Sequence, residues 1–207
     1  MAGRNRKQKN KPMSFQTLVD SMPGWCTAEK AERLQRLIID SNAQFSVELG
    51  VFGGRSLIAM ALGHKIKQSG VIIGVDAWSK QAALEGTNDK ANDDWWSGQS
   101  FKEIHQNCIK DIFKNDVDDF CSVLKMTSET FGKLIGDNTI DVLHADSNHS
   151  EEVTTREIEI FFPKLKSGGY WVADDTNWNS LSKAVSMLKE KMNVVHDGET
   201  YTIFQKK

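Results

Sequence analysis

Three aspartates near the ends of two predicted strands offer the clearest chemistry in the 207-residue sequence. Asp146 follows an apolar run over 139–145, and Asp174 and Asp175 follow another over 170–173. Parallel strands bring their carboxyl ends to one edge of a sheet, so we expect these three carboxylates to lie close together. Carboxylates that converge repel one another unless they are neutralised, and a hard divalent cation such as Mg²⁺ prefers oxygen ligands. The pattern predicts a metal site; the alternative is that Asp175 caps a helix and Asp146 orders a loop.

A strand, a glycine-rich turn and the start of a helix follow one another between Gln44 and Met60. Apolar residues over 45–49 predict a short buried strand, glycines over 50–54 break it, and apolar residues at helical spacing resume after Ser56. Such a turn leaves backbone N–H groups pointing outward and lets a ligand approach closely. We therefore expect a ligand-binding loop at the end of the first strand.

The order of the glycines distinguishes this loop from dinucleotide-binding loops. Gly50, Gly53 and Gly54 do not follow the G-x-G-x-x-G order, and Glu48 stands just ahead of them. A pyrophosphate prefers N–H groups without a neighbouring carboxylate, whereas Glu48 suits a ligand that carries an ammonium group. The hydroxyl of Ser56 suits the carboxylate of the same ligand. An amino-acid zwitterion joined to a nucleoside describes S-adenosylmethionine (SAM).

Polar residues follow five consecutive predicted strands. Asp76 ends the apolar run 70–75 and lies 26 residues after Gly50, a spacing typical of an acid that hydrogen-bonds the ribose of a nucleotide-like cofactor. A helix cap or a solvent-facing acid is the alternative for Asp76. The five sets of polar residues are Glu48; Asp76; Thr127 and Ser128; Asp146 with Asn148 and His149; and Asp174 with Asp175. Ligands of open α/β sheets bind at this edge, so we expect the functional site there.

Alternating strands and helices predict a doubly wound, Rossmann-like α/β fold with a mostly parallel seven-stranded sheet and helices on both faces. The expected strands cover 45–49, 70–75, 122–126, 139–145, 170–173, 194–196 and 201–204. The expected helices cover 15–21, 27–41, 56 onward, 101–114, 127–134, 150–165 and 181–192. The last two strands form a hairpin around 197–198 that adds an antiparallel strand at one edge of the sheet.

The length and the 39% hydrophobic content predict a single domain over 13–207, preceded by a disordered basic arm over 1–12. The helices within 13–43 would cover one end of the sheet or a partner in a homodimer. Segment 77–99 is long and polar for a connection between a strand and a helix, so we expect a lid-like loop. In that loop Trp95 and Trp96 either stack on a sugar ring or anchor the loop on the core.

The composition argues against several classes of protein. Cys26, Cys108 and Cys121 lie far apart without metal-type spacing, which is typical of buried thiols in a reducing compartment. No apolar run reaches the length of a membrane span and none follows the basic start, so we expect a cytoplasmic protein without membrane contact. Residues 1–12 carry five positive charges and no acid; since the net charge is −2, the remainder carries −7, which argues against a nucleic-acid partner.

The segment 47–56, V-E-L-G-V-F-G-G-R-S, resembles the first motif of class I SAM-dependent methyltransferases, particularly the metal-dependent catechol-type O-methyltransferases. Segments 141–151 and 165–176 are similar to a related, macrocin-type family that acts on sugars in natural products and glycans. The resemblance implies which residues hold SAM. Its methionine part would contact Glu48, Gly50, Phe52, Gly54 and Ser56. Its ribose would contact Asp76 with Ala77 and Trp78, its adenine would lie near Thr127 and Ser128, and Asp146 would also contact SAM. The resemblance also implies that Asp146, Asp174 and Asp175 bind Mg²⁺ or another hard divalent cation, which in turn binds two neighbouring hydroxyls of the acceptor.

These features predict a cation-dependent O-methyltransferase that acts on a sugar, a glycan or another polyhydroxylated small molecule. Asp146 and His149 are the expected catalytic pair, with His149 as the base because imidazole titrates near neutral pH. A structural His149 is the alternative, since the sugar-modifying relatives often have an acid where this chain has Asn148. His144 alternates into a buried strand and is expected to be a core residue. Two other functions stay open: a nicotinamide-dependent oxidoreductase, and a catalytically silent module that binds SAM or a sugar.

Overall fold

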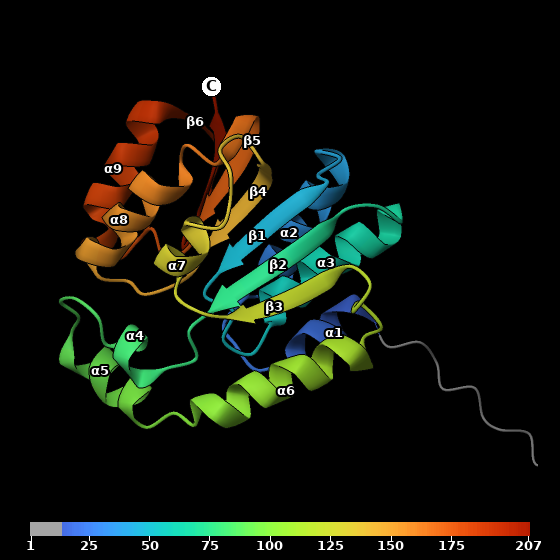
Figure 1. The fold of residues 1–207 in the computed structure, drawn as a ribbon, viewed down its shortest axis with the longest axis horizontal. Helices are drawn as coiled ribbons and strands as arrows, with labels where there is room; N and C mark the ends of the chain where they lie inside the picture. The colour runs from blue at the N-terminus through green and yellow to red at the C-terminus, as the bar shows by residue number, and fades with distance from the viewer. Residues whose placement is uncertain (1–13) are drawn as a thin grey trace, which may run out of the picture.

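A computed structural model describes residues 14–207, so the basic arm predicted over 1–12 lies outside the described residues. Seven strands form one sheet: β1 (Phe45–Leu49), β2 (Val71–Asp76), β3 (Cys121–Lys125), β4 (Ile140–Ala145), β5 (Leu165–Ala173), β6 (Met192–Asp197) and β7 (Thr202–Lys206). The helices are α1 (Phe15–Asp20), α2 (Ala28–Asp40), α3 (Arg55–Lys67), α4 (Lys80–Ala83), α5 (Lys90–Ser97), α6 (Phe101–Lys114), α7 (Ser128–Gly132), α8 (Glu151–Phe161) and α9 (Ser182–Lys191), with a 3-10 turn η1 (Asn179–Leu181). Figure 1 shows this arrangement.

The sheet has the strand order β3-β2-β1-β4-β5-β7-β6, and the neighbouring strands from β3 to β5 pair in parallel. Of the described strands, β7 alone runs opposite in direction to the other six, and it lies between β5 and β6. The predicted doubly wound, mostly parallel sheet is therefore confirmed, and the hairpin does form one edge. Its antiparallel strand is inserted one place inside that edge. The strand order reverses between β1 and β4, which is where open α/β sheets bind ligands.

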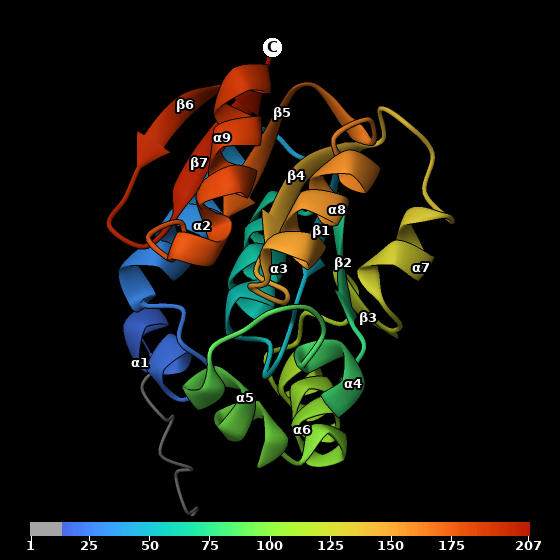
Figure 2. The same ribbon diagram turned by 90° about the vertical axis from the view of Figure 1, so that its left-hand side faces the viewer.

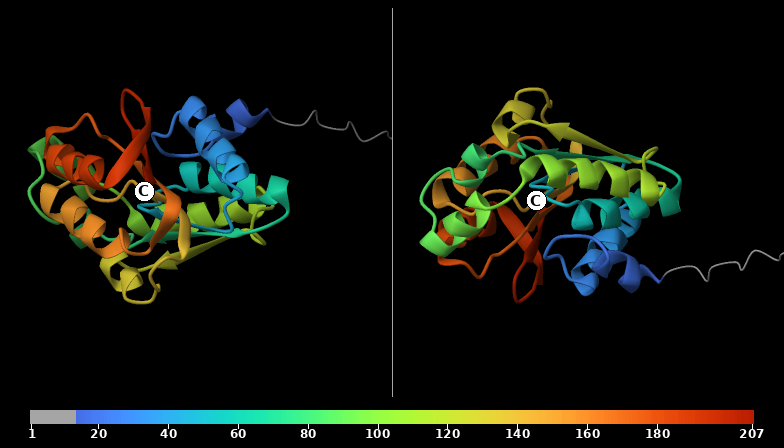
Figure 3. Two further views of the ribbon diagram at one scale, coloured as in Figure 1. Left: turned by 90° about the horizontal axis from the view of Figure 1, so that it is seen from above. Right: turned by 90° about the horizontal axis from the view of Figure 1, so that it is seen from below.

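Helices cover both faces of the sheet, and each face has its own apolar core. Side chains alternate across the strands, so Val142 and Val172 contact one core while Leu143 and Trp171 contact the other. The first core packs under α1, α2, α3 and α6, and the second under α7, α8 and α9. Figures 2 and 3 show α8 and α9 on one side of the sheet and α2 and α3 on the other.

Short polar side chains begin the helices that approach the carboxyl ends of the strands. The hydroxyls of Thr27, Thr127 and Ser150 accept from backbone N–H groups in the first turns of α2, α7 and α8. These caps fix where each helix starts, and therefore where the loops after β3 and β4 end.

Most elements match the sequence-based expectation to within about two residues, and three parts of the chain differ by more. α8 ends at Phe161 rather than at 165, because Pro163 has no N–H to continue the helical bonding. β5 begins at Leu165 rather than at 170, and residues 166–169 bulge out between the pairs Ile140–Leu165 and Val142–Tyr170. Segment 77–99, expected as a lid-like loop, contains α4 and α5, which lie beyond the arrowheads of β1 and β2 in Figure 1.

Within residues 14–207, none of the helices combines the length and the apolar character needed to cross a bilayer.

His64 is a fully buried histidine that joins α3 to the amino end of the sheet. Its Nδ1 lies 3.1 Å from the carbonyl oxygen of Ser69, and its Nε2 lies 3.1 Å from the hydroxyl of Ser46. A carbonyl can only accept, so Nδ1 carries the proton and Nε2 accepts from Ser46. Burial lowers the pKa of His64 to about 4, because the protonated ring would be a buried charge.

We predict that His64 makes the fold acid-sensitive. Its pKa is lower in the folded chain than in the unfolded chain, so its contribution is complete above pH 6.5 and is lost as pH falls towards 4. Chemical denaturation of the wild type and of His64→Gln should show a stability difference that shrinks by about 2 to 3 kcal/mol between pH 7 and pH 4.5. A difference that stays constant over this range would contradict the assignment.

Candidate functional site

A cleft of about 730 Å³ opens at the carboxyl edge of the sheet, within the usual size range of small-molecule sites. The loops after β1, β2, β4 and β5 line it together with α5 and the turn before α2. Most of the residues predicted from sequence line this one cleft: Gly50, Phe52, Ser56, Asp76, Ala77, Trp78, Thr127, Ser128, Asp146, His149, Asp174 and Asp175.

The glycine loop after β1 is held in place by Asp76. One carboxylate oxygen of Asp76 accepts from the backbone N–H groups of Val51 and Phe52, at 3.0 and 2.9 Å, and the other accepts from that of Trp78 at 2.6 Å. The backbones of Phe52 and Trp78 have φ of 48° and 38°, which is uncommon for residues with side chains. Burial raises the pKa of Asp76 despite these three N–H donors. The acid expected at the ribose is therefore also the residue that shapes the loop.

Glu48 and His144 form a buried pair on the neighbouring strands β1 and β4. Both side chains are fully buried, and Oε1 of Glu48 accepts from Nδ1 of His144 at 2.7 Å. Among the described residues, Oε2 of Glu48 and Nε2 of His144 have no hydrogen-bond partner. His144 is buried as expected, and its free nitrogen lies 3.9 Å from the carboxylate of Asp174. A buried acceptor without a donor favours a ligand that carries a donor.

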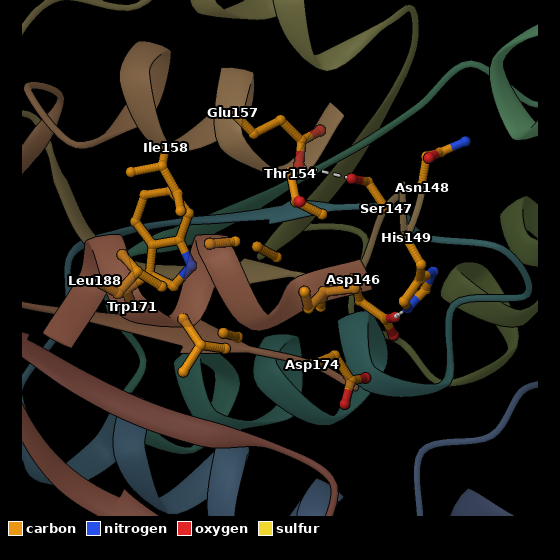
Figure 4. A pocket seen from close by; sticks show the side chains of 15 residues that line it. Asp146, Ser147, Asn148, His149, Thr154, Glu157, Ile158, Trp171, Asp174 and Leu188 are labelled. Carbon is orange, nitrogen blue, oxygen red and sulfur yellow. Dashed lines mark hydrogen bonds and ion pairs between the residues drawn. The ribbon is translucent and has the colours of Figure 1, made fainter. Parts of the chain in front are cut away.

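The acidic residues after β4 and β5 gather around two nitrogen-bearing side chains, Lys30 and His149. Lys30 of α2 donates to Oδ2 of Asp174, and its own side chain is only 4% exposed. On the other side, Nε2 of His149 lies 2.8 Å from Asp175 and 3.7 Å from Asp146. Figure 4 shows His149 turned towards Asp146, with Asp174 close by. The cluster that was expected to need a metal thus also contains a positive charge from the chain itself, the Lys30 ammonium group.

Asp146 is the residue shared by both groups of side chains whose geometry could hold a metal ion. One group consists of His144, Asp146 and Asp174, and the other of Asp146, His149 and Asp175. In each, the ligand atoms lie within 4.8 Å of one another. The three predicted aspartates therefore meet through Asp146, in two adjoining groups that each include a histidine.

The pKa values of the two neighbouring acids Asp146 and Asp174 are shifted in opposite directions. Burial and the Asp174 carboxylate raise the pKa of Asp146 well above its usual range, and Lys30 offsets only part of this. Burial acts on Asp174 too, but the Lys30 ammonium, the attraction of His144 and the hydrogen bonds from Asp146 and Lys30 together outweigh it and lower the pKa of that carboxyl. The pair therefore favours one shared proton on Asp146, with Asp174 ionised against Lys30.

The segment after β2 is fastened to the loop after β4 by Asn148. Its side-chain amide donates to the carbonyl oxygens of Ala82, Ala83 and Glu85, at distances from 2.9 to 3.2 Å. Its own oxygen accepts from the N–H of Ser150 at 2.8 Å. Asn148 therefore positions α4 over the cleft, which gives a physical reason for an amide at this place.

Four aromatic side chains form what we call the aromatic rim, at the mouth of the cleft: Trp25, Phe52, Trp95 and Trp96. Trp25 precedes α2, and its ring centroid lies 5.1 Å from that of Phe52 and 4.8 Å from that of Trp95. Trp25 and Trp95 are 65% and 40% exposed, so the rim presents apolar ring surface to solvent beside polar groups. Both earlier interpretations of Trp95 and Trp96 are compatible with this packing.

Sequence reasoning missed Lys30, Trp25 and the buried acid Glu157. Lys30 stands on the same helical stripe as Leu34 and Ile38, at spacings of four, and a lysine within an apolar stripe was the available signal. Trp25 lay in a turn between helices, where nothing local indicated a site. Oε2 of Glu157 accepts from the hydroxyl of Ser147 at 2.7 Å, as Figure 4 shows, beside a small cavity of about 30 Å³.

Comparisons with known proteins place these features in context. A family model described as "Methyltransferase domain" matches residues 47–176, while a comparison with curated proteins finds no match. The solved structure of the O-methyltransferase NovP is similar, with 15% identity, a TM-score of 0.70, and coverage of 87% of this chain and 81% of NovP. An O-methyltransferase from Bacillus cereus in complex with SAH gives 14% identity, a TM-score of 0.64 and coverage of 97% and 94%. TomG from Streptomyces achromogenes, an O-methyltransferase involved in tomaymycin synthesis and solved in complex with SAM, is 13% identical with a TM-score of 0.62. The match covers 87% of this chain and 80% of TomG.

Gly50 lets the glycine loop touch the tip of β4, and we predict that a side chain there disrupts the site. Its φ is +82°, and an added Cβ would overlap the carbonyl group of Asp146. Gly168 is a matched control, because its φ is +75° and nothing lies within 4 Å of an added Cβ. In urea denaturation, Gly168→Ala should cost about 1 to 2 kcal/mol and Gly50→Ala at least about 3 kcal/mol. Equal costs at the two positions would show that the contact with Asp146 is unimportant.

Proposed function

The chain belongs to the methyltransferase-domain family, and from this we propose that it transfers the methyl group of SAM to a hydroxyl oxygen of a polyhydroxylated, ring-containing small molecule. The observation that carries the proposal is the meeting of the glycine loop, Asp76 and the Asp146–Asp174 pair in one cleft. The similar solved structures named O-methyltransferases support oxygen as the methyl acceptor. Family membership also favours methyl transfer over the nicotinamide-dependent alternative.

The residues at the glycine loop fit the amino-acid part of SAM. Oε2 of Glu48 is a buried acceptor in need of a donor, which an ammonium group would supply. Helix α3 has Gly54 as its N-cap and no capping side chain, so its first-turn N–H groups suit a carboxylate. Ser56, in that first turn, lines the cleft. On this proposal Asp76 with Ala77 and Trp78 would contact the ribose, and Thr127 with Ser128 the adenine.

The donor set at the tips of β4 and β5 fits a hard divalent cation. Carboxylate oxygens dominate both groups around Asp146, and Mg²⁺ prefers such ligands. Asp146, Asp174 and Asp175 would hold the cation, with His144 completing the group around Asp174. A bound cation would supply Lewis acidity, which lowers the pKa of a hydroxyl that it contacts.

His149 is placed to receive the proton of the attacking hydroxyl. An ionised carboxylate only accepts, so the Nε2 atom facing Asp175 carries a hydrogen and Nδ1 is left to take a proton. The ring of Trp178 lies 4.9 Å from that of His149 and helps to fix its orientation. In the transfer, the acceptor oxygen would bond to the methyl carbon of SAM as the methyl–sulfur bond breaks and SAH leaves, and Nδ1 of His149 would take the hydroxyl proton. SAM supplies the electrophilic methyl group, made reactive by its positively charged sulfur.

The aromatic rim favours an acceptor that contains a ring. Exposed tryptophan faces stack on the apolar faces of sugars and of aromatic rings, while hydroxyls can turn towards the acids. Trp25, Trp95 and Trp96 come from two segments far apart in sequence and pack edge to face beside one another, so one flat acceptor could contact more than one of them. This supports a sugar, a glycan or a similar polyhydroxylated ring as the substrate class.

We predict that isothermal titration calorimetry detects binding of SAM and of its demethylated product SAH, and no comparable binding of NADH. Tight NADH binding with no SAM binding would contradict the function.

Asp146→Asn and Asp174→Asn should lower kcat on a diol acceptor at least about 100-fold, with Asp137→Asn, an exposed acid outside the cleft, as the control. Full turnover in both variants would remove the metal role. SAM binding with no turnover on any hydroxyl acceptor would instead identify a silent binding module.

A second prediction concerns the rim. Trp25→Ala should raise the KM for the acceptor about fivefold, as expected for the loss of one stacking contact worth about 1 kcal/mol, and should leave the Kd for SAH unchanged. Phe113→Ala is the matched control, because Phe113 is 63% exposed against 65% for Trp25 and lies outside the cleft. An unchanged acceptor KM would show that the rim only anchors the segment 77–99.

A further inference from the structure

Lys30 places an ammonium group inside the acidic cluster. Its side chain is 4% exposed and donates to Oδ2 of Asp174, whose side chain is 13% exposed. Buried lysines are rare unless they are paired, so this position needs its partner. Lys30 also lines the cleft, in contrast to lysines that pair with acids on the outer surface.

Lys30 has a second favourable contact besides Asp174. Its Nζ atom lies over the ring of Tyr201, 5.4 Å from the centroid, within the range of a cation–π contact. Asp146 adds electrostatic attraction from the tip of β4. A small movement of the flexible lysine side chain could therefore release Asp174 without leaving the ammonium group unpartnered.

A divalent cation at this cluster would meet a positive charge already in place. The group formed by His144, Asp146 and Asp174 includes the oxygen to which Lys30 donates. Two cations compete for one carboxylate oxygen, and in a partly buried site their repulsion is only weakly screened. Without any metal, in turn, Lys30 keeps Asp174 and Asp146 from repelling each other.

We propose that Lys30 is a tethered counter-ion that competes with the divalent cation for Asp174, so that the protein binds the metal weakly and keeps its site assembled without it. Lys30 acts here as a positioning residue, through Asp174. The inference rests on the metal part of the proposed function and adds a determinant of metal affinity to it.

Metal affinity measured without turnover tests the proposal. Mn²⁺ binding is followed by the electron paramagnetic resonance signal of the free ion, and Mg²⁺ binding by calorimetry. We expect Lys30→Gln and Lys30→Met to bind Mn²⁺ about tenfold or more tightly than the wild type, because a competing charge is gone. Lys30→Arg keeps the charge and should stay close to the wild type. Lys166→Gln is the matched control: Lys166 pairs with Asp141 at 2.7 Å on the same two strands, at their opposite end.

A readout on the wild type does not depend on variants that fold. In ¹⁵N-lysine-labelled protein, the ammonium signal of Lys30, assigned with Lys30→Arg, should shift when Mg²⁺ saturates the site. Equal Mn²⁺ affinity in wild type and Lys30→Gln, or an unshifted Lys30 signal at saturation, would overturn the proposal. Absence of Mn²⁺ binding in every variant would also overturn it. SAH binding measured in parallel separates these outcomes from failure of the proposed methyl transfer, which predicts that SAH binds in each case.

Discussion

The close approach of two carboxylates, Asp146 and Asp174, is the constraint on which the rest of the site depends. β4 and β5 are hydrogen-bonded neighbours, and Ala145 pairs with Ala173, so the next residue of each strand places its acid at the same height. Two such groups cannot both be ionised in a partly buried position unless positive charge or a proton accompanies them. Lys30 from α2 and His149 from the loop after β4 supply positive or proton-donating groups. The position of α2 against the sheet is thus tied to the charge balance of the cleft.

The glycine loop and the acidic cluster are also joined through the backbone. Asp76 gathers the N–H groups of the loop, and Gly50 allows that loop to lie directly against the tip of β4. The part of the cleft suited to an amino acid and the part suited to hydroxyl groups therefore share one wall. A displacement of either loop would change both halves of the cleft together.

The fold was predictable because its strands are short, mainly apolar segments that alternate with helices, and parallel topology fixes where their ends meet. That argument located Asp76, Asp146, Asp174 and Asp175 correctly at one edge without any side-chain information. It could not locate Lys30, because a lysine on a helix normally extends to solvent and only tertiary packing of α2 buries it. It also could not join Trp25 to Trp95, since the contact depends on how α5 folds back over the cleft. The helices α4 and α5, in a segment expected to be a loop, were missed for the same reason. Short polar helices are stabilised mainly by tertiary packing, which the local sequence does not show.

The three hydrogen bonds of Asn148 have a consequence for how the cleft is covered. Its three carbonyl partners all require a hydrogen-bond donor, and a carboxylate has none to give. An aspartate at position 148 would therefore release α4 from the loop that carries His149. One amide thus ties the cover of the cleft to the loop that carries its histidine, so that neither can be altered alone.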